Sequence, residues 1–64
     1  MTNTRTNTFY LDSEYDLSKV VDYIEDNTSG TIIDEGAHYG DTWVTVKDVT
    51  ETEIDKIWDY IDTL

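Results

Sequence analysis

The chain has 64 residues, with 15 Asp or Glu against 4 Lys or Arg, no cysteine and a formal charge of −11. This length allows one domain with one modest core, the lack of cysteine excludes disulfides and thiolate metal sites, and the acidic sign argues against direct binding to DNA, RNA or anionic lipid. No apolar run approaches membrane-spanning length, so we expect no membrane contact and a cytoplasmic location.

The chain begins with a polar stretch rich in Thr and Asn, and we expect residues 1–5 to form a flexible tail. Residues 6–11 are a predicted strand, because Thr, Phe and Tyr favour extended structure. The alternation of a strand would place Phe9 on one face and Tyr10 on the other.

A helix is predicted over residues 14–26, ending at the turn-forming run of residues 27–30. Its apolar residues recur at the spacing i, i+3, i+4 and i+7, which is typical of one buried helical stripe. They are Leu17, Val20, Val21 and Ile24.

Two further strands are predicted over residues 31–35 and 42–49. The first contributes Ile32 and Ile33 to the apolar residues available for the core. Residues 36–41 contain two glycines and predict a hairpin loop or a bulge.

The second helix is predicted from residue 51 to the C-terminus. Thr50 and Glu53 have the spacing of a capping box, in which each side chain binds the backbone N–H of the other. A second apolar stripe follows: Ile54, Ile57, Trp58, Ile61 and Leu64.

The order β-α-β-β-α predicts a single α+β domain over residues 1–64, with a three-stranded sheet and two helices on one face. A right-handed crossover makes strands one and two parallel, with the third antiparallel between them. This arrangement resembles a ferredoxin-like plait that lacks its last strand. The sheet face without helices would carry Tyr10, Trp43 and Lys47, and it is a candidate surface for a homodimer.

Carboxylates gather on three segments that we expect to contact a partner. The main row is on the second helix, at spacings of four, four and three: Glu51, Asp55, Asp59 and Asp62. A second row is on the first helix: Asp22, Glu25 and Asp26. A rim surrounds the hairpin and includes one aromatic residue of its loop: Asp34, Glu35, Asp41 and Tyr39. Four residues of helix rise about 6 Å, so carboxylates in the main row stand roughly 6 Å apart.

Exposure to water does not explain why the charge on these helix faces is almost entirely negative. Ordinary helix faces mix Glu with Lys at i, i+4, which stabilises a helix by a few tenths of a kcal/mol per pair. Here acid follows acid at that spacing, as in Asp55 and Asp59, and the repulsion costs about as much. Asp also outnumbers Glu ten to five, although Glu is the better helix former.

One interpretation is that the carboxylates imitate nucleic-acid phosphates and occupy the basic groove of a protein that binds DNA or RNA. Duplex DNA carries about one charge per 1.7 Å of axis, and a row at ~6 Å spacing approximates the phosphates of one strand. In size, sign and lack of cysteine the chain resembles small acidic phage-encoded inhibitors of the nucleic-acid-mimic class, of the anti-CRISPR or anti-restriction type. The resemblance implies a non-enzymatic inhibitor of a basic nucleic-acid-binding protein, such as a nuclease or a CRISPR effector. It also implies a location in the host cytoplasm if a virus encodes the chain.

The alternative is a small halophile-type or regulatory protein-interaction domain. Its acidic surface would serve solvation, and its binding surface would be the open sheet face. Low Lys with high Asp and Thr fits molar salt, whereas frequent Ile and Tyr and the presence of Asn fit it less well. We favour the inhibitor.

Enzymatic chemistry has little support in the sequence. His38 is the only histidine, and Ser13 and Ser29 lie in other predicted turns, so no nucleophile and base are brought together. The segment that starts at Asp12 resembles a calcium loop but has Leu17 where such loops need glycine. We therefore expect no catalytic residues, no metal site and no cofactor.

Overall fold

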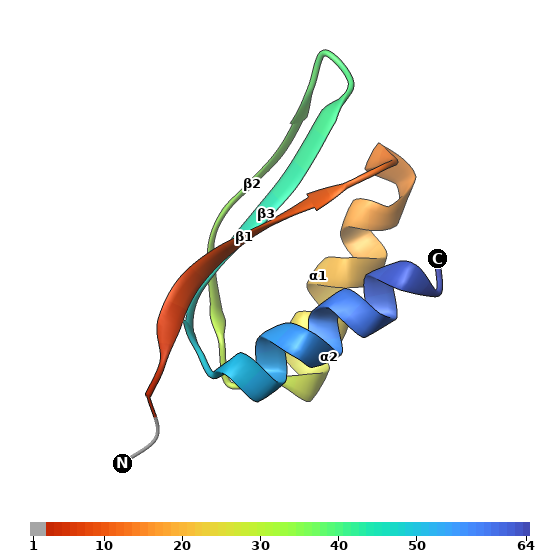
Figure 1. Ribbon diagram of the computed structural model, residues 1–64. Coiled ribbons are helices and arrows are strands. Elements are labelled where there is room, and N and C mark those ends of the chain that lie inside the picture. Colours follow the sequence, from red (N-terminus) through yellow and green to blue (C-terminus); the bar gives the residue numbers. More distant parts are fainter. Residues whose placement is uncertain (1–2) are drawn as a thin grey trace.

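The computed structural model describes residues 3–64, and it contains three strands and two helices. The elements are β1 (Arg5–Leu11), the 3-10 turn η1 (Glu14–Asp16), α1 (Leu17–Asn27), β2 (Thr31–His38), β3 (Asp41–Val49) and α2 (Glu51–Asp62). The sheet order is β1-β3-β2 with both pairings antiparallel, and both helices lie on the same side of the sheet (Figure 1). The predicted α+β architecture is confirmed, and the first helix differs from expectation in opening with a 3-10 turn.

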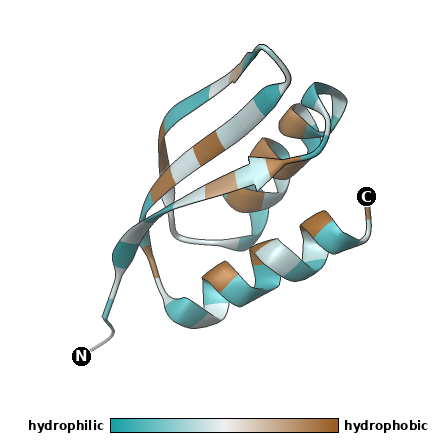
Figure 2. Cartoon of the chain, turned by 45° about the horizontal axis from the view of Figure 1, so that its top comes forward, coloured by the Kyte–Doolittle hydropathy of each residue, from teal (hydrophilic) through white to brown (hydrophobic). Residues whose placement is uncertain are grey.

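The core lies between the helices and one face of the sheet. Its buried apolar residues come from β1, α1, β3 and α2: Phe9, Leu11, Val20, Ile24, Val44, Val46, Val49, Ile54 and Ile57. Figure 2 shows the hydrophobic residues as bands that alternate with hydrophilic ones along the helices and strands. Phe9 also meets the ring of Trp58 edge to face, with 4.9 Å between centroids. The two predicted helical stripes therefore pack on the predicted inner face of the sheet, except at the end of the second one. Leu64 is 44% exposed because α2 ends at Asp62 instead of continuing to the C-terminus, and Trp58 is 38% exposed.

A β-bulge in β3 brings Val49 into the core. Asn7 pairs with Val46 and Arg5 pairs with Val49, so β3 has one more residue than β1 between these pairs. Asp48 lies in this bulge with φ 62°, in the left-handed region that Asp tolerates better than most residues. Strict alternation from Val46 would have placed Val49 on the open face, and the extra residue returns it to full burial.

A second bulge, in β2, exposes Ile33. Ile32 pairs with Val46 and Asp34 pairs with Thr45, which leaves Ile33 without a partner on β3. Its side chain is 52% exposed. The expectation that Ile33 belongs to the core is therefore wrong, because the unpaired residue falls outside the alternation that directs Ile32 inward.

The hairpin between β2 and β3 is tighter than predicted. Pairing continues to His38 opposite Asp41, so residues 36–38 belong to β2 and the turn itself holds only Tyr39 and Gly40. Their φ values of 49° and 87° are both positive, as in a type I′ turn. The hairpin extends beyond the helices (Figure 1).

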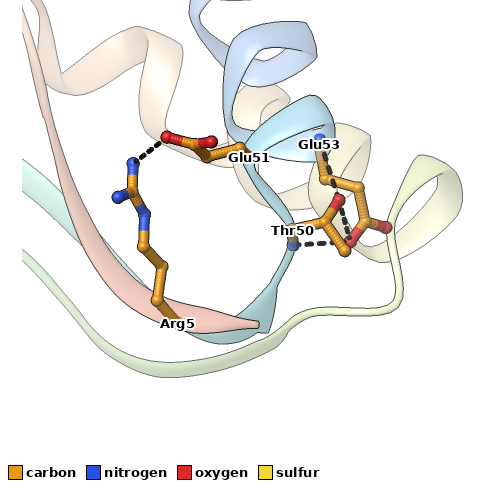
Figure 3. A network of polar contacts seen from close by, with 4 residues as sticks. All are labelled: Arg5, Thr50, Glu51 and Glu53. Carbon is orange, nitrogen blue, oxygen red and sulfur yellow. Dashed lines mark hydrogen bonds and ion pairs between the residues drawn. The ribbon is translucent and has the colours of Figure 1, made fainter. Parts of the chain in front are cut away.

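The N-terminal boundary of the sheet also differs from prediction. Residues 1 and 2 of the expected tail lie outside the described residues, but Arg5 belongs to β1 and pairs with Val49. The Arg5 guanidinium lies 3.6 Å from a carboxylate oxygen of Glu51 at the start of α2 (Figure 3). Assigning Arg5 to a flexible tail is wrong, because its backbone continues the β1–β3 ladder and its side chain meets α2.

Glu53 fixes the start of α2 and joins it to the loop before β2. The predicted capping box is present: Glu53 Oε1 accepts from the backbone N–H of Thr50 at 3.0 Å, and the Glu53 N–H donates to the Thr50 hydroxyl at 3.2 Å (Figure 3). Glu53 Oε2 also accepts from the backbone N–H of Ser29 at 2.8 Å. These hydrogen bonds, first that from Thr50 and then that from Ser29, lower the pKa of Glu53 below its ordinary value.

The two helices meet through a pair of aromatic rings. Tyr23 of α1 stacks on Tyr60 of α2, with centroids 4.2 Å apart and planes 7° from parallel. Both residues are partly buried against the core. Neither α1 nor α2 has the length and apolarity that crossing a membrane requires.

Candidate partner-binding surfaces

The main acidic row is exposed along α2, as predicted. Its four members begin in the first turn of the helix, directly after the Thr50 cap, and all are exposed: Glu51, Asp55, Asp59 and Asp62. The cap sets where the helix starts, and the helical repeat then holds the carboxylates along one side of it. We call these four residues the α2 row.

The α2 row faces away from α1 and toward the side of β1. Tyr60 marks the side of α2 that meets α1. A helix turns about 100° per residue, so Asp55 and Asp62 point roughly 140° and 160° away from Tyr60. Trp58, which contacts Phe9 of β1, lies on the same side as the row.

One member of the α2 row already has a cationic neighbour. The Arg5–Glu51 contact is the single ion pair among residues 3–64, and both side chains are largely exposed, at 55% and 80%. Exposed pairs of this kind contribute about 0–1 kcal/mol. Glu51 is thus partly neutralised, and the negative charge of the row is greatest toward its C-terminal end.

The acidic residues of α1 form a separate surface. Asp22, Glu25 and Asp26 are all exposed. Asp22 points about 160° away from the buried Val20 on the helical wheel, so this row faces solvent on the outer side of α1. Since the α2 row points away from α1, the structure does not join the two rows into one surface.

The predicted rim of the hairpin is divided between the two faces of the sheet. Glu35 pairs with Val44 and therefore lies on the helix side, whereas Asp34 pairs with Thr45 on the open side. Asp41 lines the open side as well. All three carboxylates are exposed.

The open sheet face carries an aromatic pair in a groove. Tyr10 lies directly opposite Trp43 on neighbouring strands, which confirms their predicted place on this face. The groove has a volume of about 410 Å³, and residues from all three strands line it: Thr8, Tyr10, Asp34, Asp41, Trp43 and Thr45. The hydroxyls of Thr8 and Thr45, two of these lining residues, are hydrogen-bonded at 2.9 Å.

The indole of Trp43 is held in place by β2. Its Nε1–H donates to Asp34 Oδ2 at 3.1 Å. The ring lies over Gly36, where an added Cβ would come within 2.6 Å of the indole atom Cζ2. The sequence interpretation missed this contact because it placed Gly36 in the hairpin loop, whereas β2 continues to His38 and Gly36 is a strand residue. A glycine inside a strand is a signal for close approach by another group.

Tyr39 stands at the tip of the hairpin. It is 94% exposed, has a positive φ, and its ring lies 4.1 Å from that of His38. A large side chain in the left-handed region is uncommon. Between the tip and the segment after β1 is a second groove, of about 340 Å³, which Asp12 and Glu14 help to line. Among residues 3–64, no three His, Asp or Glu side chains are grouped so that they could hold a metal ion.

Comparisons with models of known protein families, with characterised proteins and with solved structures found no match to this chain.

Proposed function

We propose that this protein is a non-enzymatic inhibitor that binds the basic nucleic-acid-binding surface of another protein, of the kind found in CRISPR, restriction or other DNA-processing systems. The observation that carries the proposal is the α2 row, which is exposed, faces away from α1 and holds three carboxylates without an ion pair among residues 3–64. Such a row presents anions at roughly 6 Å intervals.

The chemistry of Asp supports a role in binding. Its short side chain keeps the charge close to a rigid helix, so little rotamer freedom is lost when a cation docks. Three of the four members of the α2 row are Asp. Electrostatic steering toward a cationic cleft would make association fast at low salt and slower as salt rises.

The test is capture of proteins from host lysate at low salt, followed by elution with duplex DNA. We expect the wild-type chain to retain a basic nucleic-acid-binding protein that DNA then releases, because the two ligands share one cleft. Replacing Asp55 and Asp59 with Lys should abolish the capture while circular dichroism shows an unchanged fold. Capture that survives in this variant would move the binding site away from the α2 row.

The open sheet face favours a second candidate, a regulatory protein-interaction domain whose acidic surface serves solvation. The groove around Tyr10 and Trp43 is the specific observation behind it. The alternatives differ in which surface contacts the partner, so variants of the α2 row and of the open face distinguish them.

A further inference from the structure

We propose that the groove of the open sheet face binds an arginine side chain of a basic partner. This site uses the sheet and is independent of the α2 row, so it can be tested without a positive result for the proposed inhibitor function. The occupant follows from charge and shape: two aromatic rings and two carboxylates line one groove on a strongly acidic protein.

The aromatic part of the site is held in position before any ligand arrives. Trp43 is fixed by its hydrogen bond to Asp34 and by its seat over Gly36. Tyr10, opposite Trp43, is 66% exposed. A guanidinium is attracted to the faces of Trp and Tyr, on which it can stack.

The carboxylates supply the ionic part of the site. Asp34 uses Oδ2 for the indole bond, which leaves Oδ1 for a ligand. Asp41 lines the same groove at the hairpin end. Lys47, the basic residue of β3, pairs with Thr31 toward the opposite end of that strand and does not line the groove. A planar donor with several N–H groups, such as guanidinium, can bind carboxylate and aromatic faces together better than the compact ammonium of lysine.

The groove also lies where a partner segment can reach it. The helices cover the other face of the sheet, and no element of residues 3–64 covers this one (Figure 1). The hairpin that carries Asp41 and Trp43 projects past the helices, so an extended basic segment can approach without displacing any part of the chain.

The experiment follows the fluorescence of Trp43 during titration with a defined peptide, acetyl-Gly-Arg-Gly-Arg-Gly-amide. A Trp58→Phe background leaves Trp43 as the only tryptophan, and Phe keeps an aromatic ring against Phe9. We expect saturable quenching or a spectral shift at low salt, with affinity for the matching lysine peptide lower by at least about threefold. Absence of any Trp43 response, or equal affinity for the two peptides, would overturn the proposal.

Two double variants with the same loss of charge separate this site from general electrostatic attraction. Asp34→Asn with Asp41→Asn should weaken binding about tenfold, and Asn at position 34 can still accept from the Trp43 indole. Asp55→Asn with Asp59→Asn on α2 should change the affinity for the arginine peptide less than about twofold, since those carboxylates belong to the helices and do not line the groove. Equal weakening by the two double variants would show non-specific attraction and overturn the proposal.

A third variant tests the position of the Trp43 indole over Gly36 without changing any charge. Gly36→Ala places a methyl group against the indole, and we expect the arginine peptide to bind several-fold more weakly while circular dichroism shows the sheet intact. If Gly36→Ala unfolds the chain, Trp43→Leu replaces it in the same comparison, and the fluorescence anisotropy of a labelled peptide then reports binding. Unchanged affinity in a folded variant would show that Trp43 takes no part in binding and would overturn the proposal.

Discussion

Glu53 is the acidic residue with the most distinct structural role. It closes the capping box of α2 and accepts from Ser29 in the loop before β2. Its pKa is lowered in the folded state by these hydrogen bonds, with that from Thr50 the largest cause. The stabilisation is therefore present above the unfolded pKa and is lost as the pH falls through the lower folded value.

We predict that Glu53→Ala lowers the free energy of unfolding by about 1–2 kcal/mol at pH 7. The loss should shrink as the pH falls below 4.5, the ordinary pKa of Glu, and through the lower folded value, because wild-type Glu53 then becomes protonated and its carboxylate hydrogen bonds weaken. Denaturant unfolding at several pH values measures both effects. Glu51→Ala is the control, since it removes the same charge from the same turn but only an exposed ion pair. An equal, pH-independent loss in both variants would contradict this role for Glu53.

Tyr39 is a residue whose backbone conformation suits another side chain better. A type I′ turn favours Asn at its first central position, and the left-handed region costs a typical residue about 1–2 kcal/mol. We predict that Tyr39→Asn raises the free energy of unfolding by about 0.5–1 kcal/mol, because Tyr39 is 94% exposed and loses only its contact with His38. Thermal or denaturant unfolding measures this gain. Tyr39→Phe is the control, and its free energy of unfolding should equal that of the wild type. A less stable Tyr39→Asn variant would mean that the aromatic contact at the tip outweighs the strain.

At the scale of elements, local sequence patterns predict the helices and strands themselves much better than the registers in which the strands pair. The capping box of Thr50 and Glu53 is a short-range signal and was identified from spacing alone. The bulges at Asp48 and Ile33 depend on how neighbouring strands align, so alternation within one strand could not reveal them. The pairing of Arg5 with Val49 also depends on how two strands align, so the sequence near Arg5 could not predict it.

The candidate surfaces were predictable to a similar degree. Helical spacing predicts that Asp55 and Asp59 are exposed, and they are. Helical spacing alone does not predict which way the α2 row faces relative to α1. That direction follows from the Tyr23–Tyr60 contact. The separation of Glu35 from Asp34 and Asp41 likewise depends on the β2–β3 register.

The α2 helix should become more stable when its row is broken. Asp55 and Asp59 repel each other at i, i+4. Asp59→Lys converts the repulsion to attraction and places a cation near the helix C-terminus, so we predict a gain of about 0.5 kcal/mol in the free energy of unfolding. Denaturant unfolding at low salt measures the gain, and Asp59→Asn should give about half of it. If Asp59→Lys is less stable, Asp59 has a structural role that its exposure does not indicate.

For the whole molecule, the net charge of −11 predicts a definite response to salt. KCl screens like-charge repulsion, so the melting temperature should rise at first. For an inhibitor the rise should level off by about 0.5 M, where the Debye length is a few ångströms. Thermal melts at increasing KCl concentration test this, with NaCl as a comparison. A rise that continues into molar salt would instead support an acidic surface for solvation.

The most direct measurement is competition between this protein and labelled duplex DNA for a basic protein recovered by the capture experiment. The account predicts that the wild-type chain displaces the DNA and that Asp55→Lys with Asp59→Lys raises the required concentration at least about tenfold. Asp12→Lys with Glu14→Lys makes the same change of net charge away from the α2 row, and it should displace DNA nearly as well as the wild type. Equal displacement by the two double variants would contradict the claim that the α2 row occupies the nucleic-acid cleft.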